Sequence, residues 1–176
     1  MDWQGRQEET AMLEIRNAKL SDLEKIAKLE SLCFSPAEAA DRESLKQRLE
    51  VYPNHFWLLW RDGELVSMVN GMVSNEIELL DAFYTDATLH DESGDWQMLF
   101  GVETDPQFRQ RGYASILMKE AIKDCVNDSR KGIILNCKDQ YIPFYEKLGF
   151  TNRGVAKSVH GGEKWNIMEL NLEDEI

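Results

Sequence analysis

The chain has 176 residues, of which 43% are hydrophobic and 10% aromatic, and this length and composition predict one globular domain and exclude a disordered polymer. Its 20 lysines and arginines against 32 aspartates and glutamates give a net charge of −12, which disfavours nucleic acid and anionic membrane surfaces as partners. A cationic small molecule such as an amine is favoured instead. Without a membrane-spanning run or a signal-peptide pattern, the sequence predicts a soluble cytoplasmic protein.

The three cysteines and three histidines are scattered rather than set at metal-binding spacings, so we expect no metal site. Cys33, Cys125 and Cys137 lie in apolar segments and are expected to be buried free thiols in a reducing compartment. Cys137 has no histidine close to it in the sequence, which disfavours a nucleophilic role.

The first elements follow from local patterns. Residues 1–11 are polar and without periodicity, and we expect a flexible extension before a single domain at residues 12–172. A strand at residues 13–15 precedes Ser21-Asp22-Leu23-Glu24, which has the pattern of a capping box in which Ser21 and Glu24 satisfy the free amides of a helix start. This helix is expected to end near Pro36, and a second to run through residues 44–49.

The middle of the chain predicts a hairpin and a longer helix. Strands at residues 56–60 and 65–69 flank Asp62-Gly63, a pair that favours a type I′ turn. Residues 75–95 are acidic and weakly patterned, which indicates a loop region with a short helix or strand. A central strand at residues 96–104 and a helix at residues 112–126 with one apolar face follow.

The last third of the chain adds a buried strand at residues 133–135 and a helix at residues 141–148, which Gly149 is placed to end. Two closing strands are expected at residues 155–159 and 164–170, joined by a hairpin turn. The predicted order is β, α, α, β, β, β, α, β, α, β, β, which is a mixed α/β fold.

The clearest chemical signal lies between Val102 and Ala114, where a strand leaves through Pro106 into a helix start that contains Gly112. Free amides at a helix N-terminus, with little side-chain bulk, suit a pyrophosphate group, and two arginines add positive charge. The pattern is neither a Rossmann fingerprint nor a P-loop. The residues alone leave open a second interpretation, an ordinary strand–turn–helix corner with solvated arginines.

Arg109-Gln110-Arg111-Gly112-Tyr113-Ala114 resembles the acetyl-CoA signature of the GNAT superfamily of N-acetyltransferases, Arg/Gln-x-x-Gly-x-Gly/Ala, and residues 139–150 resemble a second motif of that family. The likeness covers residues 13–170. Within the superfamily the chain is most similar to serotonin (arylalkylamine) N-acetyltransferases, through residues 31–34, 135–139 and 143–146. The resemblance implies a GNAT-like α/β (α+β) fold, with a mixed, mostly antiparallel twisted sheet of about seven strands, about four flanking helices and acetyl-CoA in a central splay.

The resemblance also implies a cofactor site. Val102, Glu103 and Thr104 would hold the pantetheine arm through the strand backbone. The pyrophosphate would be held by the loop and helix start formed by Arg109, Gln110, Arg111, Gly112, Tyr113, Ala114 and Ser115. Tyr145 matches the catalytic tyrosine of the family, whose phenol, with an ordinary pKa of about 10, gives a proton to the departing CoA thiolate. The alternative is that Tyr145 only packs against neighbouring side chains and has no catalytic role.

The base is left open, because the two strand histidines of arylalkylamine acetyltransferases correspond to Met98 and Phe100, neither of which titrates. The sequence candidates are Glu103, Asp95, Glu92 and His90, beside a water chain or an amine of low pKa. On a continuous strand Glu103 faces away from Met98 and Phe100, which counts against it unless a bulge redirects it. Met98 and Phe100, together with Phe34, are expected to line an apolar substrate pocket.

The resemblance implies an acetyl-CoA-dependent acyltransferase that acts without a metal by direct attack in a ternary complex on a small primary amine, arylalkylamine-like or polyamine-like. A homodimer is compatible with it. Two alternatives stay open: acetylation of a protein or peptide, which would want an open groove, and an acyl-CoA-binding sensor without turnover.

Overall fold

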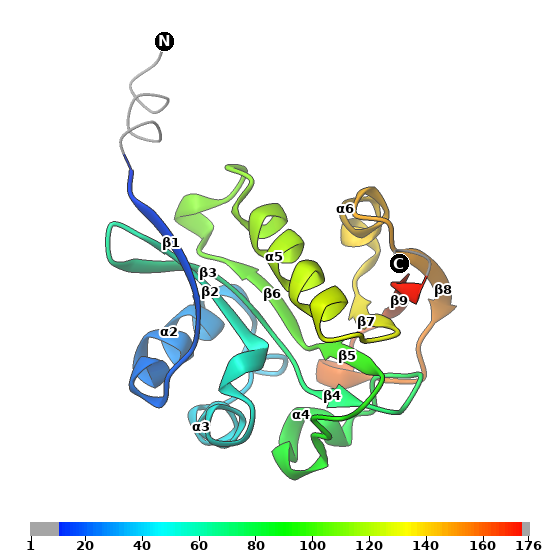
Figure 1. Cartoon of the computed structure of the whole chain (residues 1–176). Helices are drawn as coiled ribbons and strands as arrows, with labels where there is room; N and C mark the ends of the chain where they lie inside the picture. The colour runs from blue at the N-terminus through cyan, green and yellow to red at the C-terminus, as the bar shows by residue number, and fades with distance from the viewer. Residues whose placement is uncertain (1–10, 174–176) are drawn as a thin grey trace.

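The computed structural model describes residues 11–173, so the predicted flexible extension lies, except for Ala11, outside the described residues. Within that range the chain forms nine strands and five α-helices (Figure 1), somewhat more than expected. The strands are β1 (Leu13–Asn17), β2 (Phe56–Arg61), β3 (Glu64–Asn70), β4 (Val73–Ser74), β5 (Trp96–Leu99), β6 (Gly101–Thr104), β7 (Gly132–Cys137), β8 (Thr151–Val155) and β9 (Asn166–Asn171). The helices are α2 (Leu23–Cys33), α3 (Arg42–Val51), α4 (Ala82–Thr85), α5 (Tyr113–Asn127) and α6 (Ile142–Lys147). None of these helices is long and apolar enough to cross a membrane.

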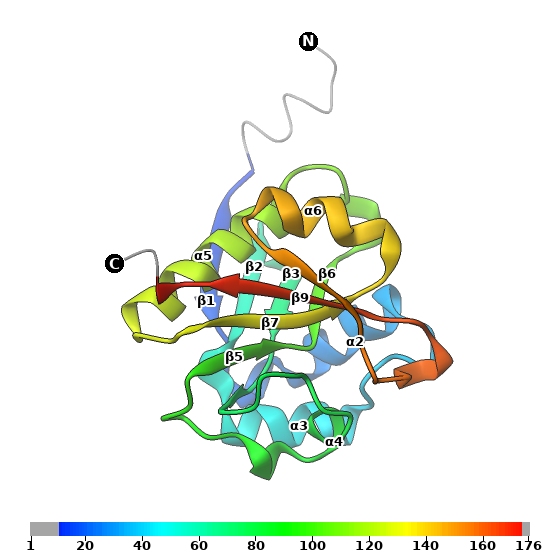
Figure 2. The same cartoon turned by 90° about the vertical axis from the view of Figure 1, so that its right-hand side faces the viewer.

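The strands form two sheets that diverge from a common middle. The first has the order β1-β2-β3-β6 and is antiparallel throughout. The second has the order β4-β5-β7-β9-β8, in which β5 and β7 are parallel and the other pairs antiparallel. Figure 2 shows β9 lying between β7 and β8. The mixed, mostly antiparallel architecture expected from the sequence is confirmed.

Two apolar layers cover the opposite faces of these sheets. In β2, Leu58 and Trp60 pack with α2 and α3, whereas Trp57 and Leu59 pack with α5, because successive side chains of a strand point to opposite faces. The helix α5 thus covers one face and α2 with α3 the other (Figure 1). The indole of Trp57 also donates a hydrogen bond of 2.7 Å to Asp124 in α5.

The hairpin prediction is confirmed in detail. Asp62 and Gly63, between β2 and β3, both have positive φ, 49° and 82°. This is the backbone form of a type I′ turn, whose twist matches the twist of the strands that it joins.

The predicted capping box is wrong in position. A short 3₁₀ turn (Leu20–Asp22) precedes α2, and the carboxylate of Asp22, rather than Ser21 or Glu24, accepts the backbone amide of Lys19 at 2.8 Å. Asp22 also pairs with Arg16 at 2.8 Å, and this hydrogen bond lowers the pKa of the carboxyl. Asp22 therefore joins the preceding strand to the start of the 3₁₀ turn, in place of the predicted Ser21–Glu24 pair.

The predicted central strand at residues 96–104 is interrupted at Phe100. Its two halves have different neighbours, since β5 pairs with β7 whereas β6 pairs with β3. Between them the amide of Phe100 donates to the carbonyl of Asn70 at 2.8 Å. Because the two sheets diverge at this point, one continuous strand could not serve both.

The second closing strand is confirmed as β9, whereas the first differs from the prediction. β8 ends at Val155, where a strand was expected to begin, and His160–Gly162 is a 3₁₀ turn rather than a hairpin turn. The register of β8 against β9 shifts between Asn152 and Gly154, a position with φ of 104°. Residues 156–165 then leave the sheet to pack against the segment after α2, through a 2.9 Å hydrogen bond from His160 Nε2 to the carbonyl of Glu38.

Leu117 gives a test of the α5 layer. Its side chain is fully buried between α5 and the sheets, so Leu117→Ala is expected to lower the free energy of unfolding by about 2–5 kcal/mol. Val126→Ala, at a 36% exposed position of the same helix, is the control and is expected to cost under about 1 kcal/mol. Chemical denaturation followed by circular dichroism measures both. Equal losses would show that α5 is not anchored by this layer.

Candidate functional site

The free edge of β6 is the centre of the candidate site. β6 pairs with β3 on one side only, and its other edge faces the gap where the two sheets part. An unpaired strand edge offers backbone N–H and C=O groups to an extended ligand. The sequence resemblance assigned this role to Val102, Glu103 and Thr104, and all three line the cavity found there.

This cavity, which we call the large cavity, has a volume of about 410 Å³. The predicted cofactor residues that line it are Val102, Glu103, Thr104, Arg109, Gln110, Gly112, Tyr113, Ala114 and Ser115, joined by Phe34 and Tyr145. Arg111 is the exception among the predicted residues, since it is absent from this lining and its guanidinium lies 5.1 Å from the ring centre of Phe108.

The turn before α5 has the geometry of an anion site. Gln110 and Gly112 both adopt positive φ, 65° and 82°, and the amide of Ile116 bonds back to the carbonyl of Gly112 at 3.1 Å. The amides of Ala114 and Ser115 precede that helical bond and lie at the positive end of the dipole of a 15-residue helix. Arg109 donates from Nε to the carbonyl of Thr104 at 3.2 Å, which fixes the turn against the end of β6.

Tyr145 reaches the large cavity from α6. Its side chain is only 7% exposed and is flanked by the rings of Phe144 and Phe150, with centroids 5.0 and 5.7 Å away. Burial raises the pKa of the Tyr145 phenol, which therefore stays protonated at neutral pH and remains a proton donor. Burial likewise raises the pKa of the nearby Cys137 thiol to about 11, so this thiol is not a nucleophile at neutral pH.

A second, smaller cavity of about 120 Å³, which we call the small cavity, lies on the side of α2 and α3. Its lining combines carboxylates with a buried arginine and aromatic rings, and includes Glu30, Phe34, Arg48, Tyr84, Phe100 and His160. Phe34 lines both cavities and stands at the wall between them. Phe34 and Phe100, two of the three residues expected to line a substrate pocket, both line the small cavity.

Met98 does not. The expectation that it lines the pocket is corrected, because its side chain is fully buried in the core among α2 and α3 residues and is absent from the linings of both cavities. Phe100, by contrast, leaves the strand at the break between β5 and β6. Its ring lies 5.1 Å from that of Tyr84, with the Arg48 guanidinium 4.6 Å from its centre.

Three of the four candidates for the base lie away from both cavities. Asp95 pairs with Lys131 at 3.4 Å, and His90 and Glu92 belong to a separate cluster. Only Glu103 reaches the large cavity. The sequence analysis missed Glu30 and Arg48, although both gave a signal: each is a charged residue at helical spacing from buried leucine or isoleucine residues.

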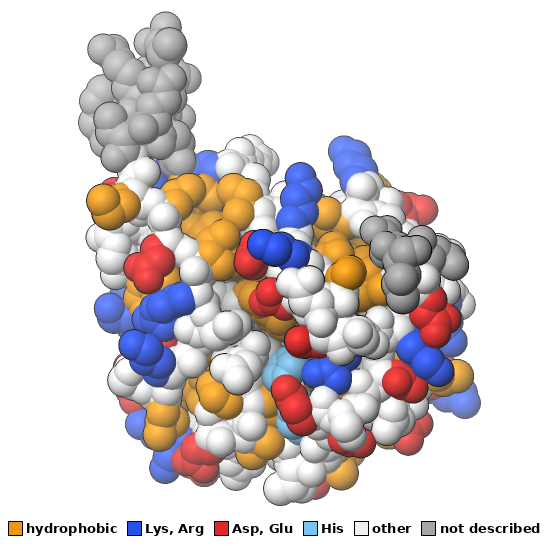
Figure 3. Space-filling model, in the orientation of Figure 1, with side chains coloured by type: hydrophobic (Ala, Val, Ile, Leu, Met, Phe, Trp, Pro, Cys, Tyr) orange, Lys and Arg blue, Asp and Glu red, His pale blue; other side chains and the backbone are white. Residues whose placement is uncertain are grey.

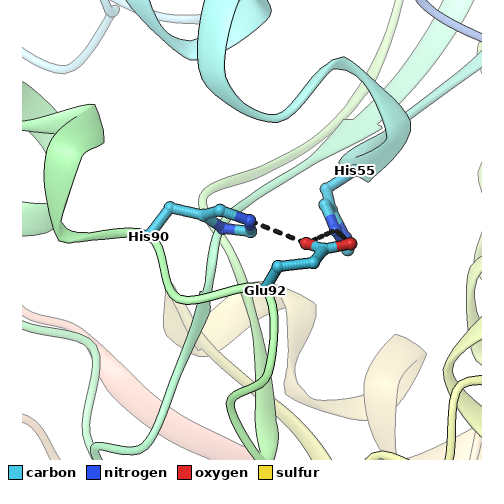
Figure 4. A group of neighbouring side chains, drawn as sticks. All are labelled: His55, His90 and Glu92. Atoms are coloured by element: carbon cyan, nitrogen blue, oxygen red, sulfur yellow. Dashed lines mark hydrogen bonds and ion pairs between the residues drawn. The ribbon is translucent and has the colours of Figure 1, made fainter.

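The separate cluster consists of His55, His90 and Glu92 (Figure 4), whose ligand atoms lie within 4.8 Å of one another. The Gln97 amide nitrogen donates to three backbone carbonyls, so its oxygen accepts a hydrogen bond from His55 Nδ1 at 2.8 Å. The Val73 amide donates to His90 Nδ1 at 3.0 Å, which places the His90 proton on Nε2.

Both imidazoles then point their Nε2 atoms at Glu92 Oε2, each at 2.7 Å. These are hydrogen-bond distances, and His90 Nε2, which carries a proton, cannot also bind a metal ion. A metal at all three ligands would require the Val73 hydrogen bond to break. The cluster thus holds the Glu92 carboxylate through the N–H of His90, with Nε2 of His55 at the same distance from Oε2.

Comparisons with known proteins agree with this geometry. A model of the acetyltransferase (GNAT) family matches residues 23–150. The loading GNATL domain of CurA from Lyngbya majuscula superposes with a TM-score of 0.81 at 15% identity, over 93% of this chain and 99% of that chain. The ribosomal-protein-S18-alanine N-acetyltransferase from Escherichia coli gives 0.69 at 19% identity, over 91% and 94%. PaiA N-acetyltransferase from Thermoplasma acidophilum, solved with coenzyme A, gives 0.68 at 16%, over 91% and 99%. At these identities the structures establish a shared fold.

His90 gives a test of the imidazole cluster. Burial lowers the pKa of His90, so the unfolded chain binds the proton more readily, and acidification below about pH 6.5 destabilises the fold. His90→Asn keeps an acceptor for the Val73 amide but cannot titrate. We expect its melting temperature to fall less than that of the wild type between about pH 7.5 and about pH 5.5. His160→Asn, outside the cluster, is the control, and an unchanged acid slope in His90→Asn would contradict this account.

Proposed function

Because this chain belongs to the acetyltransferase (GNAT) family, we propose that it transfers the acetyl group of acetyl-CoA to a small primary amine, arylalkylamine-like or polyamine-like. One observation carries the proposal. The large cavity brings together the free edge of β6, the turn before α5 and Tyr145, which are the three parts that a thioester cofactor needs around it.

Each part has a chemical role in the proposal. The amides of Ala114 and Ser115 and the charge of Arg109 suit the pyrophosphate of CoA. The backbone of Val102 to Thr104 suits the pantetheine arm, and a strand amide of β6 would donate to the oxyanion that forms on the thioester carbonyl. Tyr145 would give its proton to the departing sulfur. The amine attacks directly, and the raised thiol pKa of Cys137 agrees with a reaction that has no covalent enzyme intermediate.

The shape of the small cavity favours a small acceptor over a peptide. Residues 160–165 close it against the segment after α2: His160 bonds the carbonyl of Glu38 at 2.9 Å, and Lys138 pairs with the Glu38 carboxylate at 2.6 Å. The ring of His160 also stacks on Tyr84 with centroids 4.0 Å apart. A peptide acceptor would need an open groove here, whereas these contacts tie the two walls together.

The lining of the small cavity supports an amine with an aromatic or alkyl body. Phe34, Tyr84, Phe100 and Trp165 supply ring surface, and Glu30 supplies a carboxyl group for an ammonium. On the face drawn in Figure 3, acidic and basic side chains are interspersed, so this face does not concentrate the negative charge. Attraction of the amine would then depend on carboxyl groups inside the site rather than on net charge alone.

Release of free CoA thiol tests the function. With acetyl-CoA present, we expect steady release with phenethylamine or spermidine, well above the rate without an amine, and little release with a peptide that has a free N-terminal amine. A thiol-reactive chromophore measures the rate. Turnover with the peptide alone would favour the protein acetyltransferase alternative, and tight CoA binding without any turnover would favour the sensor.

Tyr145→Phe tests the proton donor. Loss of the hydroxyl is expected to lower kcat by about 100-fold, while the Kd of acetyl-CoA changes by less than about twofold, because the ring still packs against Phe144 and Phe150. Tyr141→Phe is the matched control, since Tyr141 also lines the large cavity but is 48% exposed. If Tyr145→Phe kept wild-type turnover, the phenol would have no role in proton transfer.

A further inference from the structure

A buried pair of carboxyl groups lies at the wall between the two cavities. Glu103 on β6 is 2% exposed and lines the large cavity, and Glu30 on α2 is 5% exposed and lines the small cavity. The two side chains interact with each other. The pair therefore connects the space that suits the thioester with the space that suits the acceptor.

The break in the central strand is what turns Glu103 towards α2. Met98 and Phe100 pack on the α2 side and Val102 packs on the α5 side, so one residue, Gly101, is added to the alternation. Glu103 then points to the same side as Phe100. A Cβ on Gly101 would lie 2.5 Å from Glu103 Oε1, so the carboxyl occupies the space that the missing side chain leaves. Glu103 therefore does not face away from Met98 and Phe100, as it would on a continuous strand.

Glu103 lacks the partners that an ionised carboxylate normally has. Among residues 11–173 neither of its carboxylate oxygens meets a hydrogen-bond donor, and Nε of the neighbouring Arg48 has no acceptor. The neighbouring Glu30 carboxyl instead raises the pKa of Glu103, and two carboxyl groups can form a hydrogen bond only when one of them holds a proton. Glu30 is held in place by the amide of Ala40, which donates to Oε2 at 3.0 Å.

The local charges balance if the pair holds one proton. Burial and the neighbouring Glu30 carboxyl raise the pKa of Glu103, while the positive charge of Arg48 lowers it. Like carboxyl groups in contact share a proton in this way. One neutral and one ionised carboxyl beside Arg48 give no net charge. The other titratable group that faces Glu103 is the Cys33 thiol, whose pKa burial raises to about 11 and which donates to the carbonyl of Thr104 at 3.3 Å.

We propose that Glu103 and Glu30 act together as the base that deprotonates the acceptor amine, with the singly protonated pair taking up a second proton. The inference rests on the proposed function. An N–H bond of the ammonium breaks and an O–H bond forms on the pair, which leaves a nitrogen lone pair to form the C–N bond to the acetyl group. The C–S bond breaks with its electrons on sulfur, which takes the proton of Tyr145. Solvent then removes the proton from the pair. The nitrogen loses a second proton as the amide forms, and this proton replaces the one that Tyr145 gave to sulfur.

Glu103→Gln tests the pair, because the amide keeps the shape of the carboxyl but cannot accept the proton. We expect kcat/KM for phenethylamine at neutral pH to fall by about 100-fold, with the Kd of acetyl-CoA changed by less than about twofold. β,β-Difluorophenethylamine, whose amine is largely neutral at that pH, should lose less than about threefold. The rise of kcat/KM with pH that reports the pair should disappear, leaving only the ionisation of the amine.

Glu30→Gln gives an independent readout. In the singly protonated pair the shared proton stabilises the remaining carboxylate. The amide that replaces the Glu30 carboxyl is a weaker donor, so the pH limb assigned to the pair is expected to move to higher pH. Asp95→Asn, which removes a surface carboxylate that lines neither cavity, is the matched control and should change neither rate nor profile.

Three results would overturn the inference: an unchanged rate and pH profile in Glu103→Gln, equal losses with the two amines, or a parallel loss of acetyl-CoA binding. The last two would assign Glu103 a purely structural role. If the wild type itself transferred no acetyl group to any amine, the proposed function would fail instead, so the two failures are distinguishable.

Discussion

The divergence of the two sheets after Leu99 is the constraint on which the rest of the site depends. β5 pairs with β7 and β6 pairs with β3, so the backbone between them must change direction at Phe100. That change leaves one edge of β6 without a strand and opens the large cavity beside it. It also adds one residue to the alternation of side chains, which brings Phe100 and Glu103 to the same side of the sheet.

The site also shows how an acidic protein can accommodate an anionic cofactor. The chain carries a net charge of −12, yet the turn before α5 offers backbone amides, the positive end of a helix dipole and Arg109 within one small region. Electrostatic interactions of this kind act over a few ångströms, and salt screens the more distant surface carboxylates. Local geometry, rather than net charge, decides which ligand a cavity suits.

The sequence predicted what short-range interactions determine. The Asp62-Gly63 turn, the apolar face of α5 and the turn with Gly112 each depend on residues within a few positions of one another, and each is confirmed. The capping box predicted before α2 was wrong because Asp22, which pairs with Arg16 of the preceding strand, accepts the Lys19 amide instead. The strand at residues 96–104 was wrong because its pairing partners lie far away in the chain.

The small cavity was beyond the reach of local patterns, because its walls come from α2, α3, the region of α4 and residues 160–165. The sequence did contain a signal for Glu30, because this residue follows Ile26 by four positions on the buried face of a helix. A charged side chain at such a position is unusual unless it has a partner or a function. Its partner, Glu103, is separated from it by much of the chain, so only the fold could join them.

The ties between residues 160–165 and the segment after α2 have a kinetic consequence. They join parts of the chain 122 residues apart through His160 and Glu38, and a stacked Tyr84 ring adds to them. Under the proposed function, an acceptor that fills the small cavity would pass this closure to enter, and its acetylated product would pass it again to leave. The residence time of the product would then be set by how often these contacts open, so the same closure that favours a small acceptor would also limit how fast the site can be reused.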